Sequence, residues 1–392
     1  MKNKKKIRNI LIFLIIFIAI DILLTQLFLH NFYYNILEKR YYAELENRIP
    51  NKYYKYTFKK KTNYKANYFG ISYTVKTNNL GFRDSEVKDL NKDNNYTIVI
   101  GDSFVEGAGL EYEDTLVGYL NEKIKTNNIK DYEFLNAGVS SYSSYIYKKK
   151  IINVIDENPW LKIDKVIVLL DKSDVVDDIR YFDRVEYFPV EKIKYNYKSP
   201  DFFEDLKKGH LWRFFYKQTM TGFFLKKVGD ILDMQRRNLR DRYKLSKKLK
   251  KSFFKISSKQ VNAFRSINTR TFISNYFHGS LWEEKSKNSI NFSIENLAEL
   301  KNYLEEKNIE FWVFIYPWPF ELVNKIQREN YVNYVSKGLT KEEINYVSAY
   351  DPFLMGDVYL NITKSYLYQD IHFNKNGNKI LANIVWETLN YE

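Results

Sequence analysis

Short apolar runs alternate with amphipathic stretches over most of this chain, and the alternation predicts its core. Runs of Ile, Val, Leu and Phe predict buried strands at 96–101, 132–136, 165–170 and 311–316, and a short fifth strand is expected at 347–351. Apolar residues at helical spacing predict helices at 114–125, 144–155, 294–306, 321–329, 341–346 and 374–389. Strands that alternate with helices, and that are apolar throughout, favour a parallel sheet covered by helices on both faces.

The alternation is interrupted twice, which suggests how the chain is organised. Residues 36–94 are polar, rich in tyrosine and without helical periodicity, so they are interpreted as an N-terminal extension with a turn near 78–84. Residues 181–290 carry an aromatic and basic segment, interpreted as a helical insertion. The predicted catalytic core therefore comprises 95–180 and 291–392.

The N-terminus has the pattern of a membrane anchor. A lysine-rich start is followed by a mostly apolar stretch at 10–29, and twenty helical residues span roughly 30 Å. Residues 1–35 are thus predicted to be a basic tail and a transmembrane helix, with the N-terminus in the cytoplasm and the body outside it, in the periplasm or at the cell surface. A cleaved signal peptide is the alternative, although no small-residue cleavage site follows. Asp21 is unfavourable within such a helix.

Charge is concentrated in one segment. The chain has a formal net charge of +14, and residues 207–270 hold nineteen lysines and arginines against three aspartates. Interleaved aromatic residues suggest docking on an anionic membrane surface or on an acidic polysaccharide, while a solvated basic helix face is the plainer interpretation. Nucleic acid is not expected as a partner, because it would require a cytoplasmic body.

Four polar segments follow predicted strands or precede the last helix. They are Gly-Asp-Ser at 101–103, Asn-Ala-Gly at 136–138, Asp-Lys-Ser-Asp at 171–174, and Asp370 with His372. The carboxyl ends of parallel strands meet at one edge of a sheet, so these segments can converge there. A serine, a histidine and an aspartate are the parts needed for acyl transfer. The chain has no cysteine, and no spacing of His with Asp or Glu suggests a metal or a cofactor.

On these segments the chain resembles the SGNH, or GDSL-like, hydrolase superfamily, and in particular its membrane-anchored, polysaccharide-modifying branches. The resemblance implies an α/β, flavodoxin-like three-layer fold with a parallel sheet, to which the sequence adds the transmembrane helix and the basic helical insertion. It implies Ser103 as nucleophile, His372 as base and Asp370 as its orienting acid. The amides of Ser103 and Gly138 would face the oxyanion. Ser173 stands where the family has an asparagine donor.

The resemblance implies serine-dependent ester hydrolysis outside the cytoplasm, on an acylated cell-surface carbohydrate or a small ester. Two alternatives stay open. The enzyme could move the acyl group to a polysaccharide hydroxyl. The domain could instead be catalytically silent and bind glycan or act as a scaffold, a view that the serine at position 173 favours.

Overall fold

A computed structural model gives the structure of the chain. It describes residues 2–25, 27–28, 46–51, 54, 56–68, 70–182, 219–269, 273, 276–277 and 279–389.

The described strands are β1 (Arg48–Pro50), β2 (Tyr56–Phe58), β3 (Asn63–Tyr68), β4 (Ile71–Thr77), β5 (Arg83–Asp84), β6 (Asn95–Ile100), β7 (Tyr132–Asn136), β8 (Lys162–Leu170), β9 (Glu310–Ile315) and β10 (Asn345–Ser348). The described α-helices are α1 (Lys2–Leu24), α3 (Ser103–Glu106), α4 (Leu116–Thr126), α5 (Ser144–Glu157), α6 (Lys172–Phe182), α9 (Met220–Leu249), α10 (Ser258–Asn268), α11 (Gly279–Leu281), α12 (Lys287–Glu305), α13 (Pro319–Val323), α14 (Lys325–Lys341), α15 (Asp351–Leu354), α16 (Val358–Ser365) and α17 (Lys375–Thr388). Short turns of other helix types are η2 (Tyr112–Asp114), η3 (Phe253–Lys255) and η5 (Trp282–Ser286).

The main sheet is mixed, so the predicted parallel sheet is wrong. In the described residues eight strands pair in the order β10-β9-β8-β6-β7-β5-β4-β3. The pairs from β10 to β7 are parallel, whereas β5, β4 and β3 join antiparallel. These three strands come from the predicted N-terminal extension. In β3 and β4 alternate residues are buried, which is the pattern of a strand with one solvated face.

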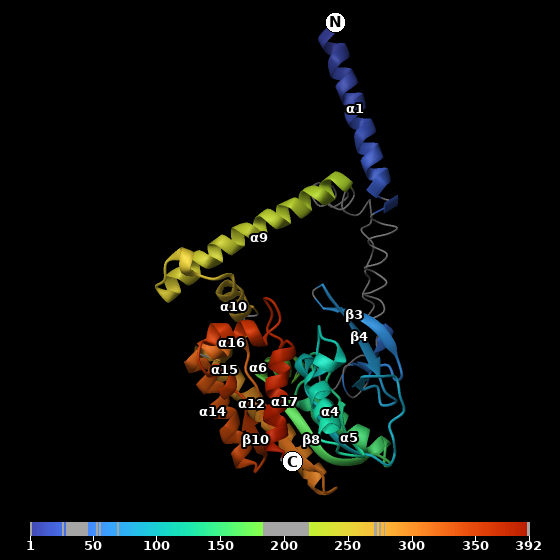
Figure 1. The fold of residues 1–392 in the computed structure, drawn as a ribbon, viewed down its shortest axis with the longest axis vertical. Coiled ribbons are helices and arrows are strands. Elements are labelled where there is room, and N and C mark those ends of the chain that lie inside the picture. The colour runs from blue at the N-terminus through green and yellow to red at the C-terminus, as the bar shows by residue number, and fades with distance from the viewer. Residues whose placement is uncertain are drawn as a thin grey trace. The chain divides into compact units, whose positions relative to one another are not determined.

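Helices cover both faces of the parallel part (Figure 1). Right-handed crossovers place the helix between β6 and β7 on one face and the helix between β7 and β8 on the other, because β7 and β8 flank β6 on opposite sides. Accordingly α4 packs with α17, and α5 packs with α12, which also contacts α6 and α14. The carboxyl end of β6 is therefore a topological switch point, where α/β folds form their ligand crevice.

The predicted transmembrane helix is also wrong. None of the helices in the described parts of the chain is long and apolar enough to cross a membrane. In α1 the apolar run from Ile10 to Ile20 rises only about 16 Å before Asp21 interrupts it, about half of the hydrocarbon thickness. Asp21 is buried, and its carboxylate accepts the amide of Thr221 at 3.1 Å, at the start of α9.

The chain divides into two compact units. One contains Met1–Ala43 and Ile193–Phe253, and the other contains Glu44–Lys192 and Phe254–Glu392. The hydrophobic core, the main sheet and every predicted site residue belong to the second unit. Of the predicted insertion at 181–290, residues 183–218 lie outside the described residues, and the part from 219 onward is largely helical. Residues 29–45 also lie outside the described residues.

Candidate active site

Ser103 stands at the tip of the turn that follows the central strand β6. The strand is buried from Tyr96 to Ile100, and the chain then turns at Gly101 into the short helix α3. Asp102 caps this helix, since its side chain accepts the Phe104 amide at 2.9 Å. The cap fixes Ser103 as the first residue of the helix, with its hydroxyl at the carboxyl edge of the sheet.

His372 reaches Ser103 from the segment before the last helix, α17. Its Nε2 atom lies 2.7 Å from Ser103 Oγ. Its Nδ1 atom lies 2.5 Å from Oδ1 of Asp370, and the same oxygen accepts the His372 backbone amide at 2.9 Å. The imidazole is buried and lies against the ring of Phe104, with 4.6 Å between the ring centroids. The structure therefore brings Ser103, His372 and Asp370 into one chain of hydrogen bonds.

Tyr68, at the end of β3, contacts the same chain of hydrogen bonds. Its hydroxyl lies 2.9 Å from His372 Nδ1 and 3.4 Å from both carboxylate oxygens of Asp370. The sequence analysis missed Tyr68, because it lies in the segment assigned to the extension and the chain has 34 tyrosines. The antiparallel hairpin of β3 and β4 thus has a part in the site.

Beneath the serine lies a cluster of buried carboxyl groups, in which Asp171 accepts the most hydrogen bonds. It accepts from the Ser173 amide at 2.6 Å and from the Ser173 hydroxyl at 2.5 Å. It also accepts from the Tyr316 hydroxyl at 2.9 Å and from the Trp318 indole at 2.6 Å. Four donors on one buried carboxyl indicate that Asp171 carries the negative charge.

Asp102 is the neutral partner in this cluster. The hydroxyls of Tyr316 and Ser173 also lie 3.1 and 3.3 Å from its oxygens, but each has a single hydrogen, which Asp171 accepts at shorter range. Burial, and after it the charge on Asp171, raise the pKa of Asp102 to about 8. At neutral pH Asp102 therefore holds a proton, with Oδ2 3.3 Å from the Ser103 hydroxyl.

The two other predicted oxyanion donors have acceptors within the protein. The Gly138 amide donates to Oδ1 of Asn136 at 3.1 Å, and the Ser173 hydroxyl donates to Asp171. Gly138 also has a packing role, because a Cβ atom there would lie 2.5 Å from the Glu106 amide of α3. The Ser103 amide, by contrast, is the first of a helix, where no carbonyl of that helix can accept it.

A buried ion pair between Arg48 and Glu106 fixes the last residue of α3. Arg48 donates to Glu106 at 2.6 and 3.2 Å, and Ser140 donates to the same carboxylate through its amide at 2.6 Å and its hydroxyl at 2.7 Å. Burial alone would raise the pKa of Glu106, but Arg48 and the Ser140 donors outweigh it, so this pKa is lowered. Glu106 thus joins β1, α3 and the loop after β7.

Arg83 anchors the end of α3. Its guanidinium is buried and donates to the carbonyls of Glu106 at 2.6 Å and Gly107 at 2.8 Å, and also to those of Leu110 and Thr74. The sequence analysis placed Arg83 in a turn near 78–84 without giving it a role. Its role here is to satisfy carbonyls that the short helix leaves unpaired.

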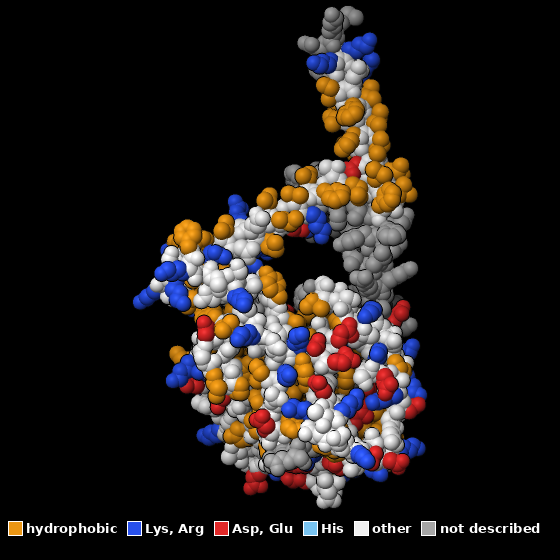
Figure 2. Space-filling model, viewed as in Figure 1, with side chains coloured by type: hydrophobic (Ala, Val, Ile, Leu, Met, Phe, Trp, Pro, Cys, Tyr) orange, Lys and Arg blue, Asp and Glu red, His pale blue; other side chains and the backbone are white. Residues whose placement is uncertain are grey.

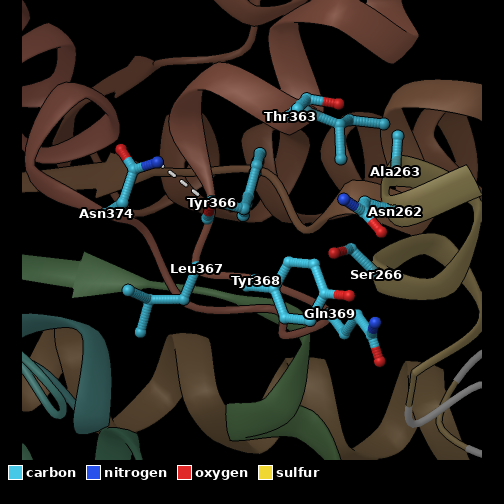
Figure 3. Close-up of a pocket in the computed structure, with 10 residues that line it drawn as sticks. Asn262, Ala263, Ser266, Thr363, Tyr366, Leu367, Tyr368, Gln369 and Asn374 are labelled. Atoms are coloured by element: carbon cyan, nitrogen blue, oxygen red, sulfur yellow. Dashed lines mark hydrogen bonds between the residues drawn. The ribbon is translucent and has the colours of Figure 1, made fainter. Parts of the chain in front are cut away.

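A cavity of about 280 Å³ borders the segment that carries Asp370 and His372 (Figure 3). It lies between α10, α16 and this segment, and its lining is uncharged: Asn262, Ala263, Ser266, Ile362, Thr363, Tyr366, Leu367, Tyr368, Gln369 and Asn374. Asn374 and Thr363 are bonded to backbone carbonyls. Figure 3 shows Asn262, Ser266 and Gln369 around the hydroxyl end of Tyr368.

No metal site is formed in the parts of the chain that the structure describes, where no three His, Asp or Glu side chains are grouped to hold an ion. Of the four histidines, His30, His210 and His278 lie outside the described residues.

No family model and no curated protein matches this chain. Solved structures do match it at low identity. An acetyl xylan esterase, AlAXEase, is 14% identical, over 75% of this chain and 99% of that one, with a TM-score of 0.39. A lipase/acylhydrolase from Enterococcus faecalis is 9% identical, over 75% and 95%, with a TM-score of 0.37. AlinE4, an SGNH-hydrolase family esterase, is 13% identical, over 67% and 80%, with a TM-score of 0.32.

Proposed function

We propose that this protein is a serine-dependent ester hydrolase. The observation that carries the proposal is the hydrogen-bonded series from Ser103 Oγ through His372 to Asp370, at 2.7 and 2.5 Å. In this reaction His372 Nε2 takes the Ser103 proton as Oγ attacks the ester carbonyl, and later gives a proton to the leaving alcohol. Asp370 holds Nδ1–H and stabilises the imidazolium. Water then hydrolyses the acyl-enzyme.

For the oxyanion we propose the Ser103 amide as the principal donor. The Gly138 amide and the Ser173 hydroxyl would first have to leave Asn136 and Asp171. The loss of one such donor costs about a hundredfold to a thousandfold in rate. We therefore expect slow turnover for this enzyme, with acyl-enzyme formation more affected than substrate binding.

We further propose that the alcohol part of the ester is an uncharged carbohydrate. The support is the cavity beside the His372 segment, whose amides, hydroxyls and tyrosine rings suit sugar hydroxyls and sugar faces. The same cavity could hold an acceptor, so transfer of the acyl group to a sugar hydroxyl is the second candidate reaction.

The test is hydrolysis of p-nitrophenyl acetate by the full chain beside Ser103→Ala, with Ser336→Ala on α14 as the matched control. We expect the first substitution to lower the rate by at least about a hundredfold and the control to leave it unchanged. A fluorophosphonate probe should label Ser103 only in the wild type and the control. If the wild type and a folded Ser103→Ala protein hydrolysed p-nitrophenyl acetate at equal rates, the proposed serine mechanism would be refuted. A catalytically silent, glycan-binding domain would then be favoured.

The cavity has its own test. Ser266→Leu should fill part of it, so we expect KM for acetylated oligosaccharides to rise severalfold while hydrolysis of p-nitrophenyl acetate stays the same. Acceleration of p-nitrophenol release by unacetylated oligosaccharide, with an acetylated product in the mass spectrum, would identify transfer. An unchanged KM would contradict the carbohydrate assignment and leave the serine mechanism intact.

A further inference from the structure

The helix α9 has an apolar stripe that is exposed to solvent. Seven side chains spaced three, four or seven residues apart lie on one side of the helix and are each 52–60% exposed: Phe224, Leu225, Val228, Ile231, Leu232, Leu239 and Tyr243. A water-soluble helix usually buries such a stripe against a core. Figure 2 shows hydrophobic side chains along the visible side of α9.

The rest of this helix is strongly basic. Its sequence has nine lysines and arginines against three aspartates. Each aspartate lies within ion-pair distance of a neighbouring basic residue, as in Lys226–Asp230 at 2.9 Å and Asp233–Arg237 at 3.1 Å. The acids are therefore neutralised within the helix, and the excess positive charge borders the apolar stripe.

Contacts at the ends of α9 stabilise the helix without packing against a hydrophobic core. Thr219 caps its N-terminus by accepting the Gly222 amide at 2.9 Å, and Asp21 of α1 accepts the Thr221 amide. Lys250 ends it in the left-handed region, with φ of 51°. The helix has 30 residues and extends about 45 Å, and the stripe follows it from Phe224 to Tyr243 with a gap of seven positions between Leu232 and Leu239.

We infer that α9 docks in the plane of an anionic lipid surface, with the stripe among the acyl chains and the basic residues at the headgroups. The apolar stripe and the positive charge together identify this partner. An acidic polysaccharide or a nucleic acid would match the charge but would leave seven apolar side chains in water. This inference does not depend on the proposed ester chemistry.

Because the chain has no cysteine, one introduced cysteine can carry one environment-sensitive label such as NBD. Val228→Cys places it on the stripe, and Asp230→Cys, roughly 200° around the helix, places it on the polar side at similar exposure. Each full-length protein is mixed with vesicles of phosphatidylcholine alone or with phosphatidylglycerol added. We expect a brighter, blue-shifted label at 228 only, and only with phosphatidylglycerol.

Binding should weaken about tenfold or more between about 0.1 M and 1 M salt, where the screening length falls from about 10 to 3 Å. Ile231→Ser with Leu232→Ser should weaken it similarly, whereas Ile326→Ser, an exposed apolar residue of α14, should not. Four results would each overturn the inference. They are no response, an equal response at both positions, a response at 228 to polygalacturonate, or one that grows with protein concentration without lipid.

Discussion

Tyr68 places a hydroxyl where the imidazole of His372 meets Asp370, 2.9 Å from Nδ1. Because these contacts are to the base and to its orienting acid, we assign Tyr68 as a positioning residue that holds the aspartate and the ring in register.

We expect Tyr68→Phe to lower kcat for p-nitrophenyl acetate about threefold to thirtyfold while KM hardly changes, because one hydrogen bond to the acid–base pair is lost. The pH profile of kcat should also shift, since the hydroxyl stabilises the charged carboxylate. Tyr346→Phe, on β10, is the matched control. A Tyr68→Phe enzyme with the wild-type rate and pH profile would contradict this role.

Asp102 gives a residue-scale prediction about stability. Its folded pKa of about 8 lies above the ordinary 3.8, so between these values the folded state binds more protons than the unfolded state. The contribution of Asp102 is complete below pH 3.8 and is lost as the pH rises to about 8. We expect the free energy of unfolding of Asp102→Asn to exceed that of the wild type increasingly toward pH 8, by at most about 1.4 kcal/mol for each pH unit.

Asp171→Asn is the contrasting variant for this measurement by urea unfolding. It turns an amide toward four donors, so we expect a loss of about 1–3 kcal/mol at pH 6. If both variants lost the same stability with the same pH dependence, the division into a neutral Asp102 and a charged Asp171 would be wrong.

At the scale of elements, the ion pair of Arg48 and Glu106 connects β1 to the helix of the nucleophile. Arg48→Met leaves a buried carboxylate with only the Ser140 donors, so we expect a loss of about 3–5 kcal/mol at pH 7. Because the pKa of Glu106 is lowered in the fold, the ion pair's contribution is present above the ordinary carboxyl range and is lost as the pH falls through the folded pKa.

Two further variants complete that experiment. Adding Glu106→Gln to Arg48→Met should restore part of the lost stability, because no buried charge is then left alone. Lys61→Met, which removes the exposed pair with Asp89, should cost less than about 1 kcal/mol. Equal losses for the Arg48 and Lys61 variants would contradict the structural importance of the buried pair.

Hydrophobic pattern predicts some elements of this fold and not others. The strands β6, β7 and β9 were predicted to within one residue of their ends, because each contains an apolar run that ends in buried positions. The prediction missed the polar start of β8 at Lys162, and it placed the last strand at 347–351 where β10 is Asn345–Ser348. The sheet extension by β3 and β4 was not predicted, since their alternation of tyrosine and polar residues is weak and the extension joins the sheet through a long-range pair, Arg83 of β5 with Asn136 of β7. The helix α6 was missed because Asp171 and Ser173 resemble a loop.

The same holds for the site. Ser103, His372 and Asp370 could be predicted from short motifs, and the structure brings them together. Tyr68 and Arg48 could not, because nothing local marks a tyrosine or arginine whose partner is distant in sequence. The transmembrane helix at 10–29 was predicted from a count of apolar residues, whereas no helix in the described parts of the chain is long and apolar enough to cross a membrane.

At the scale of the whole molecule, the site and the stripe of α9 belong to different compact units. We expect Val228→Ser with Ile231→Ser to leave p-nitrophenyl acetate hydrolysis within about twofold of the wild type, because neither side chain belongs to the core of the second unit. Ser103→Ala should leave vesicle binding unchanged. Measuring both activities on both variants tests the separation, and a loss of hydrolysis in the stripe variant would contradict it.

The distance in sequence between Ser103 and His372, 269 positions, also affects biosynthesis. At translation rates of about 5–20 residues per second, the nucleophile is made roughly 15–50 s before its base. The central strand and its serine can therefore leave the ribosome without any capacity to attack esters, and the nascent chain cannot acylate itself until its carboxyl-terminal segment has folded back.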